Sequence, residues 1–89
     1  MDSIEQLEGY LEAHDGEGVG FFTNPDYLSA IIGMSQDGRL VYDYDKMVEY
    51  LMEKEKWSEE DAMDFIDCNA IPTIPYMGEK HPVVVYGIE

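Results

Sequence analysis

Basic residues are scarce in this chain. Its 89 residues include five Lys and Arg against 20 Asp and Glu, which gives a net charge of −15 at pH 7 with His neutral. No Lys or Arg precedes Arg39, whereas eight acids do. Nucleic-acid binders neutralise phosphates with basic side chains, so the charge excludes the usual protein of that class, and it argues equally against anionic membrane surfaces. Mutual repulsion of the carboxylates also destabilises the folded state, so we expect their excess to serve a role other than folding.

Cysteine and long apolar runs are also lacking. Cys68 is the only cysteine, so the chain has no internal disulfide, CxxC motif or zinc site, and a reducing, cytosolic setting fits best. Cys68 lies beside the apolar stripe of a predicted helix, and we expect a buried structural thiol. No stretch approaches the ~18 apolar residues of a membrane span, and the acidic start is unlike a signal peptide. We therefore expect a soluble cytoplasmic protein.

Motifs of catalysis and cofactor binding are missing. No nucleophile pairs with a base, and His14 and His81 stand at the ends of predicted elements, where His14 suits a helix C-terminus. The acidic segment 43–48 fails as an EF-hand loop because Met47 and Val48 occupy its fifth and sixth positions. Neither GxGxxG nor GxxxxGK occurs. The sequence thus predicts a protein that is not an enzyme, with no metal site and no cofactor.

Hydrophobic residues make up 45% of the chain, which is enough for one small folded domain over residues 1–89. Period and turn signals predict an α+β fold of order α-β-β-α-α-β. The expected elements are a helix over 3–14, a helical turn over 25–30, strands over 31–35 and 39–43, helices over 45–55 and 58–69, an extended run over 70–75 and a strand over 83–87.

Local signals set these boundaries. Ser3 followed by Gln6 is typical of a capped helix start, as is Ser58 followed by Asp61. Pro72 and Pro75 disfavour helix and predict the extended run. The last strand is expected to join the hairpin in a three-stranded antiparallel sheet, covered by helices on one face. The expected central core residues are Val41, Leu51, Phe65, Ile66 and Val84.

Two rows of acids stand out in the predicted helical hairpin. The first row is Asp45, Glu49 and Glu53, and the second is Glu60, Asp64 and Asp67. Residues four apart on a helix lie ~6 Å apart along its axis, a spacing that approximates phosphates along a nucleic-acid strand. Such rows can occupy a groove lined by Lys and Arg. The alternative is that they are solvated helix faces that keep the protein soluble.

Tyrosine supplies a different candidate surface. Tyr offers a large contact area with one polar tip and is frequent at interfaces, although most tyrosines here are expected in the core or on the sheet. Tyr76, between two turn-like stretches, is the predicted exposed anchor.

Residues 37–51, 62–67 and 75–78 (DGRLVYDYDKMVEYL, AMDFID and PYMG) resemble a group of small acidic proteins from phages, prophages and gut bacteria. The resemblance covers about the C-terminal half and brings no catalytic residues. It implies a mobile-element origin, and small acidic phage proteins are often inhibitors of host defence, some of them nucleic-acid mimics of the anti-CRISPR kind.

Two functional hypotheses follow. The first is an interaction protein whose carboxylates block a basic nucleic-acid-binding surface, for example on a CRISPR effector or another defence nuclease. The second is a structural or regulatory module that binds a protein partner, or itself, through a hydrophobic and tyrosine surface.

Overall fold

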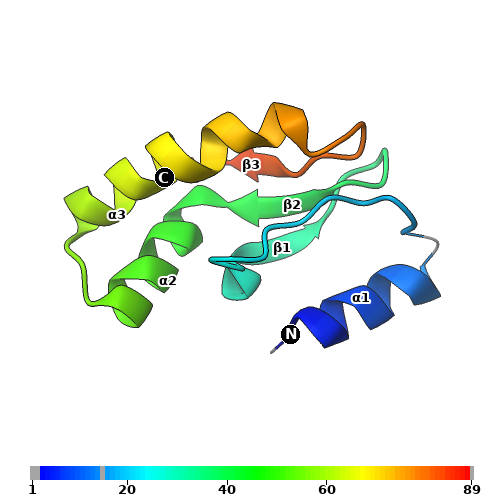
Figure 1. Ribbon diagram of the computed structural model, residues 1–89, viewed down its shortest axis with the longest axis horizontal. Helices are drawn as coiled ribbons and strands as arrows, with labels where there is room; N and C mark the ends of the chain where they lie inside the picture. Colours follow the sequence, from blue (N-terminus) through cyan, green and yellow to red (C-terminus); the bar gives the residue numbers. More distant parts are fainter. Residues whose placement is uncertain (1–2, 15, 89) are drawn as a thin grey trace.

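The computed structural model describes residues 3–14 and 16–88 as a small α+β domain (Figure 1). Two of the eight acids that precede Arg39, Asp2 and Asp15, lie outside the described residues. The elements in chain order are α1 (Ile4–Ala13), a 3₁₀ turn η1 (Leu28–Ala30), β1 (Ile31–Met34), β2 (Leu40–Asp43), α2 (Tyr44–Glu55), α3 (Glu59–Phe65), a π-helical turn η2 (Ile66–Ala70), a 3₁₀ helix η3 (Ile71–Tyr76) and β3 (Val83–Val85). The predicted fold class and the order of helices and strands are confirmed.

Helix α1 begins and ends where the sequence predicts. The Ser3 hydroxyl accepts a hydrogen bond from the Gln6 N–H at 3.2 Å, which satisfies a donor that the first helical turn leaves unpaired. His14 caps the other end, where its Nδ1 lies 2.9 Å from the Tyr10 carbonyl oxygen. The buried side chains are Leu7 and Leu11, which lie four apart on one face.

The sheet is mixed, and the predicted all-antiparallel arrangement is wrong. Strand β2 lies in the middle, pairs antiparallel with β1 and pairs parallel with β3. A parallel pair needs a long crossover, and α2, α3, η2 and η3 supply it between β2 and β3. A β-branched run such as Val83–Val85 favours a strand but does not fix its direction.

The predicted extended run over 70–75 is also wrong, because the chain continues as a helix through η2 and η3 (Figure 1). Ile71, Ile74 and Met77 pack against the core at a spacing of three, which matches the three residues per turn of a 3₁₀ helix. Pro72 stands in the first turn of η3, where a missing N–H costs least. Packing therefore overrides the local preference of the prolines.

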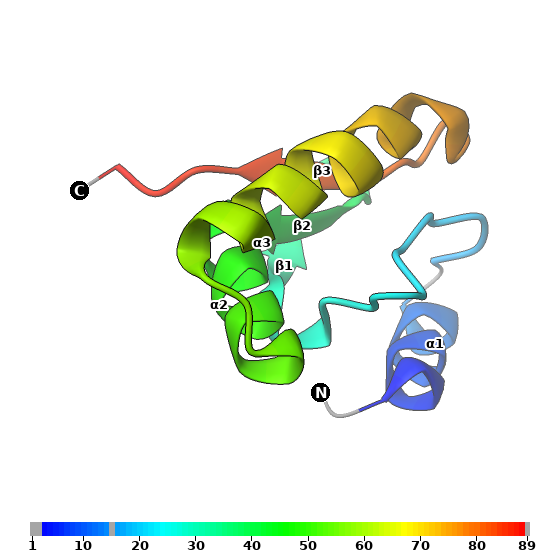
Figure 2. The ribbon, with the colours of Figure 1, turned by 60° about the vertical axis from the view of Figure 1, so that its left-hand side comes forward.

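The core lies between the sheet and the helices. Leu51 and Ile66 are fully buried as predicted, while Phe65 and Val84 pack against the core half-buried. Val41 is half-buried on the other face of β2, because neighbouring residues of a strand alternate and Leu40 and Tyr42 take the core side. Figure 2 shows α2 and α3 in front of the sheet, on this core side.

Cys68 is exposed, which corrects the predicted buried thiol. The buried residues of the π-helical turn are Ile66 and Ala70, so the three residues between them face outward.

Candidate functional site

Few carboxylates of this protein form an ion pair with a basic side chain. Within residues 3–14 and 16–88, the one ion pair joins Arg39 Nε to Asp37 Oδ2 at 3.0 Å. The Ser35 hydroxyl and the Arg39 side chain hold the pKa of Asp37 below its usual range. Two other bases bond to neutral oxygens, since Lys54 Nζ donates to the Tyr50 hydroxyl and Lys80 Nζ to the Glu17 carbonyl. The helix carboxylates therefore keep their full negative field.

Helix α2 carries the first acidic row, and Asp43 starts the helix by accepting a hydrogen bond from the Lys46 N–H at 3.1 Å. The core face of α2 consists of Tyr44, Met47, Val48 and Leu51. Asp45, Glu49 and Glu53 are all exposed on another face. Successive members lie ~6 Å apart along the axis, as expected for residues four apart.

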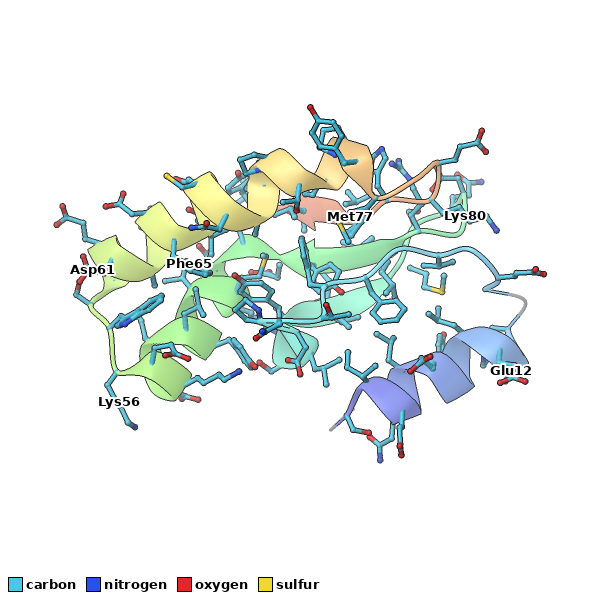
Figure 3. All side chains as sticks on the ribbon, in the orientation of Figure 1. Glu12, Lys56, Asp61, Phe65, Met77 and Lys80 are labelled. Atoms are coloured by element: carbon cyan, nitrogen blue, oxygen red, sulfur yellow. The ribbon has the colours of Figure 1, made fainter. Side chains whose placement is uncertain are left out.

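Helix α3 carries Glu60 and Asp64 of the second row, and the following turn η2 carries Asp67. The start of α3 is capped as predicted, because the Ser58 hydroxyl accepts a hydrogen bond from the Asp61 N–H at 3.2 Å. Ala62 and Ile66 take the core side. Glu60, Asp64 and Asp67 are all exposed. Figure 3 shows Asp61, in the first turn, at the outer tip of this helix.

The two rows meet at Tyr44, the first residue of α2. Its hydroxyl donates a hydrogen bond to Asp67 Oδ1 at 2.8 Å, while Asp45 follows Tyr44 directly in the chain. Burial raises the pKa of Tyr44 above its ordinary value, and the hydrogen bond and charge of Asp67 raise it further. The exposed ring of Tyr86 packs on Tyr44 with centroids 4.8 Å apart. This junction combines two carboxylates with an accessible aromatic ring.

The junction is a feature that the sequence patterns missed. Helical spacing places acids on a face but does not say which ends of two rows will touch. The Tyr44–Asp67 contact spans 23 residues and depends on the π-helical turn that carries Asp67.

Tyr76 is 89% exposed, which confirms its predicted exposure. It ends η3, and Figure 1 places that end of the helical layer away from the hairpin between α2 and α3. The structure thus brings one member of each row, Asp45 and Asp67, to Tyr44 and leaves Tyr76 as a separate feature.

A further acidic feature lies beside α1, where a cavity of about 480 Å³ opens between the helix and the following loop. Glu8, Glu12 and Glu17 line it together with the apolar side chains of Leu11, Val19 and Phe21. Figure 3 shows Glu12 at the far end of α1. A Lys or Arg side chain, with an apolar stem and a cationic head, matches this lining.

The sheet offers an apolar surface on the face away from the helices. Val41, Val83 and Val85 share that face by strand alternation and parallel register, and each is half-buried. Ile32, at the irregularity in β1, is 49% exposed. This face is the structural counterpart of the hydrophobic surface in the second hypothesis.

Metal clusters, membrane-spanning helices and similarity to known proteins do not identify a function for the site. In the part of the chain that the structure describes, no three or more His, Cys, Asp or Glu side chains group to hold a metal ion, and no helix has the length and apolar character needed to cross a bilayer. No model of a known protein family matches the chain, and neither curated proteins nor solved structures give a significant match. The chemistry of its surfaces is therefore the basis for a functional proposal.

Proposed function

We propose that this protein is a non-enzymatic, cytoplasmic interaction protein whose two acidic rows occupy a basic nucleic-acid-binding groove on a partner protein. The observation that supports this most is that all six row carboxylates are exposed and that none has a basic partner within residues 3–14 and 16–88. The resemblance to acidic phage and prophage proteins suggests the partner class, a host defence nuclease of the kind that anti-CRISPR proteins block. The protein itself does not bind nucleic acid or membrane in this proposal.

The geometry of the hairpin suits this role. Helices α2 and α3 pack against each other, and the chain reverses direction around residues 56–58, so the two rows lie on neighbouring helical segments. Packed helix axes lie about 8–10 Å apart, and row members four residues apart lie ~6 Å apart along the axis. The Tyr44–Asp67 hydrogen bond ties the lines at one end. A preformed array loses little conformational entropy on binding, and its field speeds association with a basic surface.

The cavity beside α1 offers a second acidic surface to the same partner. A basic side chain of the partner could enter it while the hairpin lies in the main groove. This contact is secondary in the proposal, and it predicts that reversal of Glu8 or Glu12 weakens binding less than reversal on α2.

The test requires a partner that is captured from the bacterial host with the immobilised full chain and then purified. Binding of wild type is compared with Glu49→Lys/Glu53→Lys by biolayer interferometry. The matched control is Glu55→Lys/Glu79→Lys, which changes the net charge equally at exposed positions outside the rows. We expect the row variant to weaken binding at least tenfold more than the control, and a DNA duplex to compete with wild type.

Salt dependence adds a second criterion. The Debye length falls from about 10 Å at 0.1 M to about 3 Å at 1 M, so association should slow strongly as salt rises. A row variant that binds with full affinity would reject the mimicry proposal, and so would a partner that keeps its DNA when this protein is bound.

A second candidate function is a structural or regulatory protein-binding module, with the acids serving solubility. The open apolar sheet face and the exposed Tyr76 favour it. In that case Tyr76→Ala should weaken partner binding more than the row reversal does. Salt should then matter little, because burial of an aromatic ring is not screened.

A further inference from the structure

Strands β2 and β3 carry apolar side chains on both of their faces. In β2, Val41 lies on the face opposite to its two core-facing neighbours. In β3, Val84 packs against the core. Val83 pairs with Val41 in parallel register, so Val83 and Val85 lie on the same face as Val41. These three valines, Val41, Val83 and Val85, form the surface that we call the open face.

The open face lacks a cover within the described part of the chain. Among residues 3–14 and 16–88, neither the core cluster nor the apolar side chains packed against it include any of the three valines. A sheet face that meets water commonly carries polar residues, whereas strands in parallel sheets are covered on both faces and are continuously apolar. The run Val83–Val85 and its parallel pairing with β2 are of the second kind. The pattern therefore indicates a second layer that the described residues do not provide.

Opposite charges stand at the two ends of the open face. Alternation along the chain places Arg39, just before β2, and Asp43, at its end, on the same face as Val41. Four residues of strand separate these two charges by ~13 Å. Arg39 Nη1 lies 3.3 Å from His81 Nε2, so the starts of the two parallel strands meet at the basic end. Asp37 binds Nε of Arg39, and the other N–H groups of the guanidinium can donate to a second carboxylate.

We propose that the open face binds the open face of a second copy of this chain, with the strands of the two copies running in opposite directions. A two-fold axis across the strands then places Arg39 of each copy over Asp43 of the other. The parallel orientation would place like charges together. The valines of the two copies pack at the ~10 Å distance of stacked sheets. Charge selects a second copy as the occupant, because one face carries both members of the ion pair.

The net charge of −15 on each copy opposes association, and the position of the open face limits this cost. The acidic rows belong to the helical layer on the core side of the sheet, so they lie away from the second copy and stay accessible (Figure 2). Three short strands spaced ~4.8 Å apart make a contact smaller than the roughly 800 Å² per partner of a standard interface, so the dimer is weak. The proposal does not rest on the function of the acidic rows.

The test measures self-association of the full chain by sedimentation velocity, from about 10 µM to about 1 mM protein, in about 0.3 M NaCl to screen the repulsion between copies. We expect wild type to dimerise. Val83→Lys should weaken the dimer at least about tenfold, although it lowers the net negative charge, because it buries a charge in the contact. The matched control is Met63→Lys, which makes the same change of charge at an exposed apolar position of α3 and should not weaken the dimer.

A pair of charge variants tests the orientation. Arg39→Asp gives the open face acids at both ends, and Asp43→Arg gives it bases at both ends, so each variant alone should dimerise at least about tenfold more weakly than wild type. When the two variants are mixed, both ion pairs are restored, and we expect a heterodimer about as tight as the wild-type dimer. Circular dichroism checks that each variant is folded, since Asp43 also caps α2. The Val83→Lys comparison does not depend on these variants.

Amide signals of the ¹⁵N-labelled chain locate the contact. Dilution of wild type should shift the signals of Val41 and Val83 and leave that of Tyr76 unchanged. A wild type that stays monomeric up to about 1 mM would assign the open face to another protein and overturn the proposal. The proposal is equally rejected if Val83→Lys dimerises as strongly as Met63→Lys, if dilution shifts helix signals in place of those of Val41 and Val83, or if the folded charge variants do not associate when mixed.

Discussion

Ser58 shows how one side chain can fix the start of a helix. Its hydroxyl satisfies the Asp61 N–H, and three acids in the first turn, Glu59, Glu60 and Asp61, complement the positive end of the α3 dipole. Ser58→Ala should lower the free energy of unfolding by about 0.5–2 kcal/mol in urea titrations. Ser29→Ala, at an exposed position without a capping role, should leave it within about 0.5 kcal/mol. Equal urea unfolding midpoints for wild type and Ser58→Ala would show that the Ser58 cap does not stabilise α3.

Tyr42 and Tyr27 make stability sensitive to alkaline pH. Burial, the largest effect, raises the pKa of each from 10.0 to about 12. Between these values the folded chain keeps protons that the unfolded chain has released, so the free energy of unfolding should fall as pH rises from 10 to 12. The fall is on the order of 2 kcal/mol for each tyrosine.

Tyr42→Phe and Tyr27→Phe isolate these two groups from the other alkaline titrations. Each variant should show a shallower fall in urea midpoint between pH 10 and 12 than wild type. Tyr42→Phe should also be less stable at pH 7, because the Tyr42 hydroxyl accepts a hydrogen bond from the buried Phe22 N–H. Parallel curves for wild type and both variants would contradict the assignment.

At the scale of elements, the Tyr44–Asp67 hydrogen bond connects the start of α2 to the π-helical turn. A hydrogen bond to a carboxylate is worth more than a neutral one, but the exposure of Asp67 reduces its value. We expect a coupling energy of about 1 kcal/mol in a double-mutant cycle of Tyr44→Phe and Asp67→Ala, measured by chemical denaturation. Tyr44→Phe keeps the ring contact with Tyr86, so the cycle isolates the hydrogen bond. Strictly additive single effects would show that the contact contributes nothing.

Elements whose signals are local were predictable from the sequence. Ser3 and Ser58 predict two helix starts that the structure confirms. The direction of β3 was not predictable, because it depends on where the chain returns after η3. The helix over 71–76 was not predictable from proline preferences, because packing of Ile71, Ile74 and Met77 at a spacing of three overrides them.

The candidate sites show the same division between local and distant information. Exposure of the acidic rows follows from helical period, so it could be predicted. The junction at Tyr44 joins segments far apart in the chain, so helical period alone could not place it.

For the whole molecule, the dominant fact is a large excess of negative over positive charge, five Lys and Arg against 20 Asp and Glu. Exposed carboxylates crowd α1, α2 and α3, while one ion pair offsets them within residues 3–14 and 16–88. Screening should therefore stabilise the folded state. If added salt relieves about 1 kcal/mol of repulsion, the Tm of a domain this size rises by about 4–8 °C. We expect that rise between 0.01 and 0.3 M NaCl, measured by circular dichroism.

Salt also strengthens hydrophobic burial, so a charge variant must separate the two effects. Glu8→Gln/Glu12→Gln removes two exposed charges from the later part of α1, whose last turn has no base to offset the negative end of its dipole. This variant should melt at a higher temperature than wild type in 0.01 M NaCl and gain less from added salt. The two proteins should approach each other at 0.3 M, where the Debye length is well below 10 Å. If salt raised the Tm of the two proteins equally, the stabilisation would come from hydrophobic burial. Charge repulsion would then not destabilise the fold.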